Sequence, residues 1–109
     1  MEAPRKDVPV IINVSFKHMD TSESLRTYVT EKTEKLKKYF DGKIHVTWTL
    51  SIEKLEHIAH CHLLGNRMDY FGEASCPTFH EAIDFSIEKI EKQVRKHKEI
   101  VKDHLHKNG

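Results

Sequence analysis

The stretch IHVTWTLSI, residues 44–52, alternates apolar and polar side chains along its whole length. A period of two residues is typical of a β-strand with one face in a hydrophobic core and the other in solvent. We therefore expect a strand here, with its histidine, threonine and serine side chains exposed. The predicted inward side chains are those of Ile44, Val46, Trp48, Leu50 and Ile52.

Strands are also expected on both sides of this segment. Residues 10–17 show the same alternation of apolar and polar side chains. Residues 57–64 and 67–76 are two further strand candidates, which Gly65-Asn66 would join as a hairpin turn. Gly72 interrupts the last strand and predicts a weak point there, because glycine has no side chain to pack.

A first helix is expected between the first two strands. Asp20 and Ser22 are both candidates for the residue that caps its first turn, and Glu23 completes a pattern resembling a capping box. Apolar side chains then follow at helical spacing. Gly42 is expected to end the helix as the residue just beyond its C-terminal cap.

The remaining elements complete the fold prediction. Pro77 opens a second helix, with Thr78 or the preceding Cys76 at its boundary. The order strand, helix, three strands, helix predicts an α+β fold, a two-layer β-α-β-β-β-α sandwich whose four-stranded sheet has both helices on one face. With 109 residues, one domain is expected. We place a polar N-terminal arm at 1–9, the domain at 10–106 and a short tail at 107–109.

Composition excludes several classes of protein. No apolar run approaches the roughly 20 residues that a membrane-spanning helix needs, so no membrane partner is expected. The first residues also lack the apolar stretch of a secretory signal, and we expect a cytoplasmic location. Cys61 and Cys76 form no paired motif and are read as reduced thiols.

The distribution of charge is the first indication of function. Lys and Arg number 18 against 17 Asp and Glu, so the formal net charge is only +1. Residues 44–88 nevertheless contain two basic residues against seven acidic ones, whereas residues 89–109 contain seven basic against three acidic ones. A basic C-terminal segment of this kind suggests an anionic partner.

The charges of the second helix separate into two lanes when residues are placed about 100° apart around its axis. An acidic lane holds Asp84, Glu88 and Glu91, and a basic lane holds Phe85, Lys89, Lys92 and Lys96. Charges on a solvated helix are also common without any binding role. Because like charges four residues apart repel one another, their segregation favours an anionic ligand.

The first helix offers matching cations. Lys32 and Lys35 lie on one flank, between Tyr28 and Tyr39, and we expect the basic lane of the second helix to face them across a shared groove. Lysines with interleaved aromatic rings suit a nucleic-acid backbone, but the alternative that the two tyrosines border the core is favoured for the rings themselves.

Chemistry of other kinds has little support. His57, His60 and His62 suggest a metal-binding or pH-sensing alternative, but no CxxC, HExxH or convergent carboxylate accompanies them. No glycine-rich phosphate loop or oxyanion-hole turn is visible. We therefore expect no enzyme, no cofactor, no metal and no small-molecule substrate.

Two long segments resemble a known family. The stretches FKHMDTSESLRTYVTEKTEKLKKYFDGKI, residues 16–44, and FHEAIDFSIEKIEKQVRKHKEIVKDH, residues 79–104, resemble the hibernation promoting factor family, also called the ribosome-associated inhibitor or sigma-54 modulation family. The similarity extends over about residues 10–105, and the short form of the family is the nearest match. It implies a fold similar to the double-stranded RNA-binding domain.

The resemblance also implies a function. Members of the family bind the small ribosomal subunit, mainly through ribosomal RNA with ribosomal proteins nearby, and block the messenger and transfer RNA sites during stationary phase or stress. Inactive ribosome dimers, formed jointly with a ribosome modulation factor, are a further expectation. A general double-stranded RNA-binding module is the alternative. The RNA-binding residues implied are Lys17, His18, Lys32, Lys35, Lys37, Lys38, Lys89, Lys92, Arg95, Lys96 and Lys98.

Overall fold

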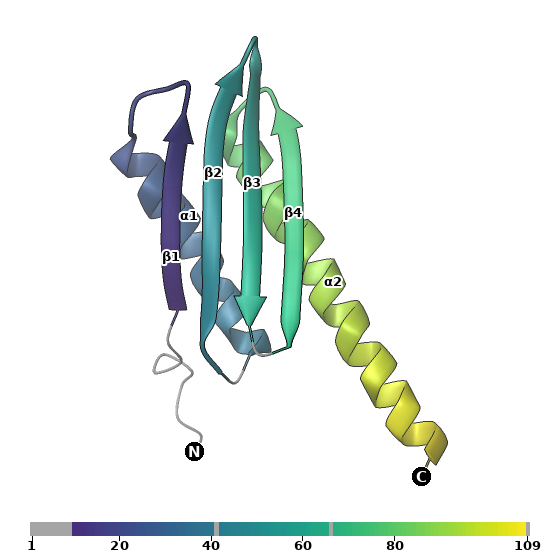
Figure 1. The fold of residues 1–109 in the computed structure, drawn as a ribbon. Coiled ribbons are helices and arrows are strands. Elements are labelled where there is room, and N and C mark those ends of the chain that lie inside the picture. Colours follow the sequence, from purple (N-terminus) through teal and green to yellow (C-terminus); the bar gives the residue numbers. More distant parts are fainter. Residues whose placement is uncertain (1–9, 41, 66, 109) are drawn as a thin grey trace.

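The computed structural model of the chain describes residues 10–40, 42–65 and 67–108, with side chains up to His97. Its order of elements confirms the predicted one (Figure 1). The predicted arm at residues 1–9 lies outside the described residues. The elements are β1 (Val10–Lys17), α1 (Glu23–Glu34), a 3-10 helix η2 (Lys35–Tyr39), β2 (Ile44–Glu53), β3 (Glu56–Gly65), β4 (Met68–Cys76) and α2 (Phe79–Asn108).

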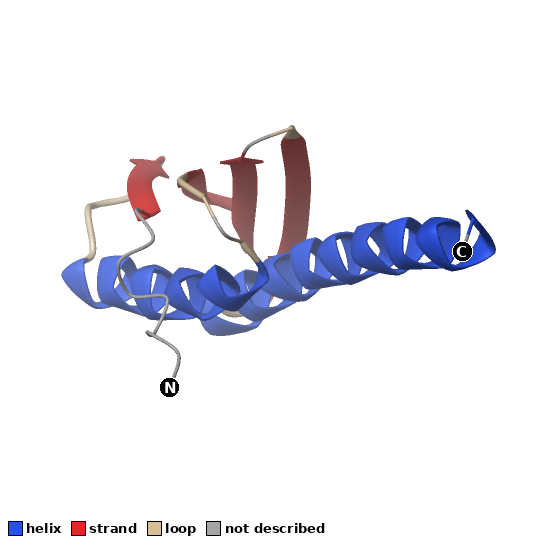
Figure 2. Cartoon of the chain, turned by 90° about the horizontal axis from the view of Figure 1, so that it is seen from below, coloured by secondary structure: helices blue, strands red, loops and turns tan. Residues whose placement is uncertain are grey.

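The four strands form one mixed sheet in the order β1-β2-β3-β4. β1 runs parallel to β2, while β2 with β3 and β3 with β4 are antiparallel. Both helices cover the same face of the sheet, as Figure 2 shows, so the predicted two-layer α+β fold is confirmed. The helix between two parallel strands must cross over them. This places α1 behind β1 and β2, and α2 behind β3 and β4 (Figure 1).

The core lies between the sheet and the helices. Four of the five predicted inward side chains of β2 are at most 1% exposed, and Trp48 at their centre has no exposed surface, whereas Ile52 is only partly buried. Its indole N–H donates a hydrogen bond of 2.9 Å to Thr33 Oγ1 on α1. That buried polar pair stabilises the contact between β2 and α1 because a buried indole N–H needs an acceptor.

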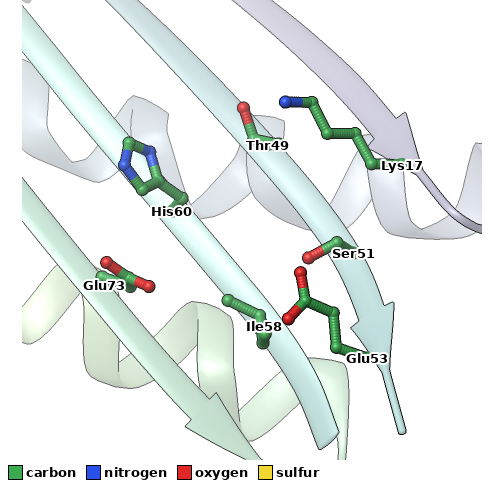
Figure 3. A pocket seen from close by; sticks show the side chains of 7 residues that line it. All are labelled: Lys17, Thr49, Ser51, Glu53, Ile58, His60 and Glu73. Carbon is green, nitrogen blue, oxygen red and sulfur yellow. The ribbon is translucent and has the colours of Figure 1, made fainter.

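No helix of the described residues covers the other face of the sheet (Figures 1 and 2). The alternation of faces predicted for β2 is confirmed, since Thr49 and Ser51 lie on this open face with Lys17 of β1 and His60 of β3 (Figure 3). The expected exposure of the serine is wrong, because Ser51 is only 7% exposed. Among the described residues, no helix has the length and apolar character needed to cross a membrane.

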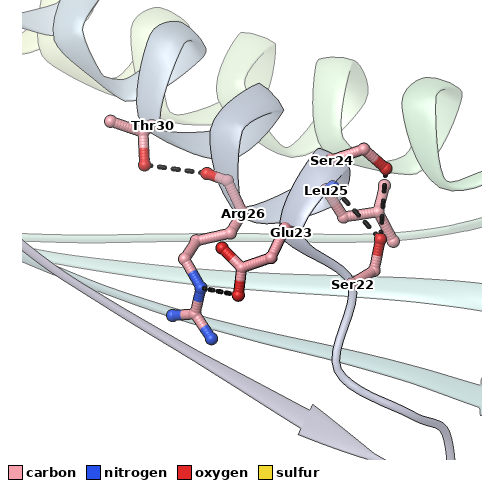
Figure 4. Close-up of polar contacts among 6 residues, drawn as sticks. All are labelled: Ser22, Glu23, Ser24, Leu25, Arg26 and Thr30. Carbon is pink, nitrogen blue, oxygen red and sulfur yellow. Dashed lines mark hydrogen bonds and ion pairs between the residues drawn. The ribbon is translucent and has the colours of Figure 1, made fainter.

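The start of α1 differs in part from the prediction. Ser22, not Asp20, caps the helix, because its Oγ accepts a hydrogen bond of 3.3 Å from the Leu25 N–H (Figure 4). Glu23 is then the first residue of the helix, which is too early for a capping-box partner. The predicted capping box is therefore wrong, and Glu23 instead pairs with Arg26 at 3.5 Å.

The end of this helical segment also differs. After η2 the chain becomes extended at Phe40, whose side chain is 2% exposed and packs in the core. Gly42 does not adopt a left-handed conformation, so the predicted glycine C-terminal signal is wrong. Burial of the Phe40 ring directs the chain out of the helix before Gly42 is reached.

Gly72 has a structural purpose that the sequence did not reveal. A Cβ atom at this position would lie 2.5 Å from the backbone oxygen of Ser86 on α2. Gly72 is thus the point at which β4 and α2 approach closely, and the weak-point interpretation is wrong. Thr78 caps α2, accepting a hydrogen bond of 3.3 Å from the Glu81 N–H, so Thr78 is confirmed as the boundary residue. Pro77 lies before this cap, and the prediction that it opens the helix is wrong.

Candidate nucleic-acid interface

The solvent-facing side of α2 carries several exposed cations. Lys92, Arg95 and Lys96 are exposed, and none of them has an ion-pair or hydrogen-bond partner among those residues. Free ammonium and guanidinium groups on one side of a helix can meet successive phosphates without first breaking an internal contact. We call Lys89, Lys92, Arg95 and Lys96 the outer flank of α2. Arg95, four residues after Glu91, lies at its border with the acidic lane.

The rotation of α2 about its axis follows from its buried side chains. Ile83, Ile90 and Val94 are at most 1% exposed and face the sheet. Gln93 lies beside this stripe and reaches β4, where its side-chain amide accepts from the Phe71 N–H at 3.4 Å and donates to the Phe71 carbonyl at 2.7 Å. The Lys89 ammonium donates to the carbonyl of Glu73 on the same strand. The outer flank therefore begins at the β4 edge of the sheet.

The opposite flank of α2 faces α1, and here the structure corrects the sequence prediction. The pocket between the two helices is lined by Lys32 and Lys35 on one side and by the acidic lane of α2 on the other. The predicted basic groove, with Lys89, Lys92 and Lys96 facing Lys32 and Lys35, is wrong. α1 lies on the acidic side of α2, so the pocket has mixed charge. The α2 side chains lining it are Asp84, Ile87, Glu88 and Glu91.

An ion-pair network crosses that pocket. The Lys32 ammonium lies 3.3 Å from Asp84 Oδ1 and 5.3 Å from the centre of the Tyr28 ring. The Tyr28 hydroxyl donates to the same carboxylate oxygen at 2.7 Å. Burial lowers the pKa of Lys32, but the Asp84 contact outweighs it and the pKa is raised overall. Burial, together with the bond to Asp84, raises the pKa of Tyr28. Lys32 therefore joins the two helices as a cation.

The other candidates in the first helical segment differ in availability. The Lys37 ammonium pairs with Glu34 at 2.8 Å, and its side chain is 18% exposed. Lys35 and Lys38 are exposed, and the Lys38 ammonium lies 5.3 Å from the centre of the Tyr39 ring. Among the candidates of this segment, only Lys35 and Lys38 have no ion pair with another described residue.

Three candidates lie elsewhere. Lys17 projects onto the open face of the sheet, beside Thr49 (Figure 3). His18 follows it in the turn with a φ of 59°. The side chain of Lys98 lies outside the part of the chain whose side chains are described. The ten candidates whose side chains are described are thus distributed over three regions rather than gathered in one groove.

Sequence reasoning missed two residues that position this interface. Asp84 was assigned to an acidic lane, but helical periodicity does not predict its contacts with Lys32 and Tyr28. Gln93 occupies a neutral position in the periodic pattern, although it pins α2 to β4. No local signal identifies either contact, because each joins residues at least 22 positions apart.

The histidines divide between the two faces of the sheet. His60 and His62 lie on the open face as predicted, whereas His57 packs inward with its ring 4.7 Å from that of Phe79. His62 contacts Asp69 at 2.6 Å. In the described part of the chain, no three His, Cys, Asp or Glu side chains are grouped so as to hold a metal ion.

Comparison with known sequences gives one consistent result. Residues 12–102 match the family model described as sigma 54 modulation protein / S30EA ribosomal protein. The ribosome hibernation promoting factor of Escherichia coli strain K12 is 33% identical over 93 residues, which cover 85% of this chain and 98% of that protein. The protein of the same name from Azotobacter vinelandii is 31% identical over 88 residues, covering 81% and 82% of the two chains.

Solved structures share the fold. The N-terminal domain of Protein Y from Thermus thermophilus superposes with a TM-score of 0.74 at 20% identity, covering 83% of this chain and 99% of that one. A ribosomal subunit interface protein from Coxiella burnetii gives a TM-score of 0.67 at 21% identity, covering 80% and 96%. At these identities the likeness concerns the fold alone.

Proposed function

Because this chain belongs to the sigma 54 modulation protein / S30EA ribosomal protein family, we propose that it is a ribosome hibernation factor of the cytoplasm. It binds the small ribosomal subunit through ribosomal RNA, blocks the messenger and transfer RNA sites, and silences translation in stationary phase or stress. It acts by occupying these sites and not by catalysis. The family relationship supports the ribosomal role, and the charges of the helices support the RNA contacts.

The observation that carries the RNA assignment is the set of unpaired cations on the outer flank of α2. Lys92, Arg95 and Lys96 are exposed and have no partner among the described residues. Binding phosphates releases condensed counterions from RNA, which favours association at low salt. Lys35 and Lys38 supply the second contact from η2. Lys32 and Lys37 contribute less, because their ammonium groups are already paired with Asp84 and Glu34.

A charge-reversal experiment tests this assignment. Co-sedimentation of Lys92→Glu/Lys96→Glu with purified small subunits should show a loss of binding over a series of salt concentrations. The salt dependence of the binding constant should also become shallower by about 0.7 to 0.9 for each phosphate that the variant no longer neutralises. Far-UV circular dichroism would verify that the variant is folded.

The matched control changes the net charge equally at the hairpin turns. Lys54 and Arg67 are exposed, and both lie outside the helix layer. Lys54→Glu/Arg67→Glu should bind subunits almost as the original protein does. An equal loss of subunit binding in both variants would show that only net charge matters. Unchanged subunit binding by the α2 variant would exclude the outer flank as the RNA-binding site.

Free duplex RNA separates ribosomal recognition from general RNA binding. A duplex of about 20 base pairs, slightly longer than the stretch that double-stranded RNA-binding domains span, is the suitable competitor. We expect it to displace the protein from subunits only at a large excess. Displacement at equal concentration would instead identify a general double-stranded RNA-binding module.

Ribosome pairing is the remaining part of the proposal. We propose that the protein promotes inactive ribosome dimers jointly with a separate ribosome modulation factor. Sucrose-gradient profiles of ribosomes with each protein alone and with both together would test this. A dimer peak that needs both proteins is expected, and a profile unchanged by this protein would contradict it.

A further inference from the structure

The open face of the sheet has the opposite charge to the outer flank of α2. Side chains alternate along each strand, and the strand register brings the outward ones together in rows. These outward residues include one lysine, Lys17, and four carboxylates, Glu53, Glu56, Asp69 and Glu73. When histidine is counted as neutral, the outward side chains carry more negative than positive charges, so the face is acidic. A face of this sign repels a nucleic-acid backbone and attracts a cationic partner.

A shallow pocket on this face contains unpaired acidic groups. Figure 3 shows Glu53 on one side, with Glu73 and His60 across the strands and the Ile58 side chain between them. Neither the Glu53 nor the Glu73 carboxylate has an ion-pair or hydrogen-bond partner among the described residues. The hydroxyl groups of Thr49 and Ser51 also line the pocket, as does Lys17, whose side chain lies beside Thr49 (Figure 3).

Exposed apolar side chains also lie on this face, Phe71 beside the pocket and two others toward the opposite end of the strands. Phe71 is 46% exposed, and its ring meets His60 edge-to-face with the centroids 4.3 Å apart. Ile11 and Leu64, which are 39% and 44% exposed, flank His45 in one row across β1, β2 and β3. Three of the five large apolar side chains that are exposed in the described chain thus lie on this face. Apolar side chains gathered beside polar ones are typical of protein-binding surfaces.

We propose that the open face docks an extended protein segment that bears arginine, and that the pocket receives the arginine side chain. The guanidinium lies between Glu53 and Glu73, while its methylene stem covers Ile58. A planar guanidinium presents several N–H donors at once and can satisfy two carboxylates and neighbouring hydroxyls, which a single ammonium cannot. Neighbouring apolar side chains of the segment pack on Phe71.

The inference goes beyond the proposed function and does not depend on it, since it concerns the layer that the helices leave uncovered. Its chemistry also favours a protein over RNA, because the phosphates of RNA would meet four carboxylates and one lysine. A chain held to RNA by the outer flank of α2 would keep this face available for a second, basic partner.

Peptide titration of the free protein tests the proposal. The probe is a blocked hexapeptide of alternating arginine and leucine, added to uniformly ¹⁵N-labelled protein and followed by amide chemical shifts. We expect shifts at Thr49, Ile58 and His60, with no comparable shifts along the outer flank of α2. Glu53→Gln/Glu73→Gln should weaken the peptide about tenfold or more, because both charge partners of the guanidinium are removed.

Two controls make the result specific. Glu31→Gln/Glu88→Gln removes the same charge from the exposed surface of the helix layer and should leave the affinity nearly unchanged. A hexapeptide with lysine in place of arginine should bind more weakly than the arginine peptide.

Several results would overturn the proposal. Equal affinity for the lysine peptide, or unchanged binding by the Glu53→Gln/Glu73→Gln variant, would reduce the effect to general charge attraction. Shifts confined to the helix layer would exclude the open face. Shifts of the open face that depend on protein concentration without peptide would identify a second copy of the chain as its occupant.

Discussion

The Lys32 ammonium of α1 and the Asp84 carboxylate of α2 lie 3.3 Å apart and join the two helices. Tyr28 donates a hydrogen bond to the same carboxylate. A lysine that the sequence assigned to RNA binding is thus used inside the protein. Cations of the helix layer therefore differ in whether they must first break an internal contact to bind a phosphate. Substitutions can distinguish the paired cations from the unpaired ones.

Asp84→Asn should release Lys32 without removing a cation. Subunit affinity is expected to stay the same or to rise, because the freed ammonium can now reach a phosphate. The free energy of unfolding should fall by about 1 kcal/mol, since a partly buried ion pair and hydrogen bond are weakened. Urea unfolding and co-sedimentation measure the two effects. Asp69→Asn, whose carboxylate is more exposed, should change stability less; a large loss of subunit binding by Asp84→Asn would contradict this account.

Thr33→Val tests the buried acceptor of Trp48. Valine keeps the shape of the side chain but leaves the indole N–H without its 2.9 Å hydrogen bond. An unsatisfied buried donor costs about 1–3 kcal/mol, which urea unfolding would detect. Thr30→Val is the matched control, because the Thr30 hydroxyl bonds only to the Arg26 carbonyl of its own helix. Similar losses in both variants would show that the hydroxyl of Thr33 has no special importance.

Gly72→Ala should destabilise the protein because the new Cβ meets the Ser86 carbonyl oxygen at 2.5 Å. Forcing β4 and α2 apart is expected to cost about 1–3 kcal/mol, the range for overpacking in a tight core. Gly42→Ala meets no atom within 4 Å and should change stability little. Thermal unfolding of the two variants measures the difference, and equal melting temperatures would refute the close approach.

Gln93→Ala should expose the edge of β4. The Gln93 amide occupies both the N–H and the carbonyl of Phe71, so its loss leaves two backbone groups available to another strand. Open strand edges promote association between chains. We expect light scattering on mild heating to rise earlier than in the original protein. Lys92→Ala, a truncation on the exposed flank of the same helix, should behave as the original does.

Thiol reactivity reports on the core at Cys61. Burial raises the pKa of the Cys61 thiol well above its usual value of 9.0. The folded protein therefore keeps the proton that the unfolded chain releases. The stability of the fold is consequently unaffected by this thiol below pH 9 and falls as the pH rises above it, because ionisation then favours the unfolded chain. Alkylation of Cys61 should stay slow at about pH 9 and become fast in urea. Rapid alkylation of the folded protein would contradict the burial.

Local patterns in the sequence were sufficient for most elements of the fold. The alternation at Val46, Trp48 and Leu50 identified β2 and its buried face, and Thr78 was correctly among the candidates for the α2 cap. The error at Glu23 followed from a local choice between two capping residues, but the errors at Gly42 and Gly72 share another cause. Each depended on how closely a neighbouring segment would pack, and neither residue propensity nor hydrophobic periodicity predicts the distance between two segments.

The candidate interface was also predictable only in its local features. Helical periodicity separated the basic lane of α2 from its acidic lane, because positions three and four residues apart share a side of a helix. It did not reveal which lane would face α1. That depended on the crossover between parallel strands, which places α1 beside Asp84 and leaves Lys92 and Lys96 in solvent.

By itself, then, the sequence determined the strands, the helices, their buried faces and the sign of each flank, since these follow from the spacing of residues close together in the chain. The tertiary structure decided which cations remain free. The sheet topology places Asp84 opposite Lys32, which is therefore paired, and leaves Lys92 facing solvent without a partner among the described residues. Electrostatic contact depends on distances in space, and those exist only once β1, β2 and the helices have packed together.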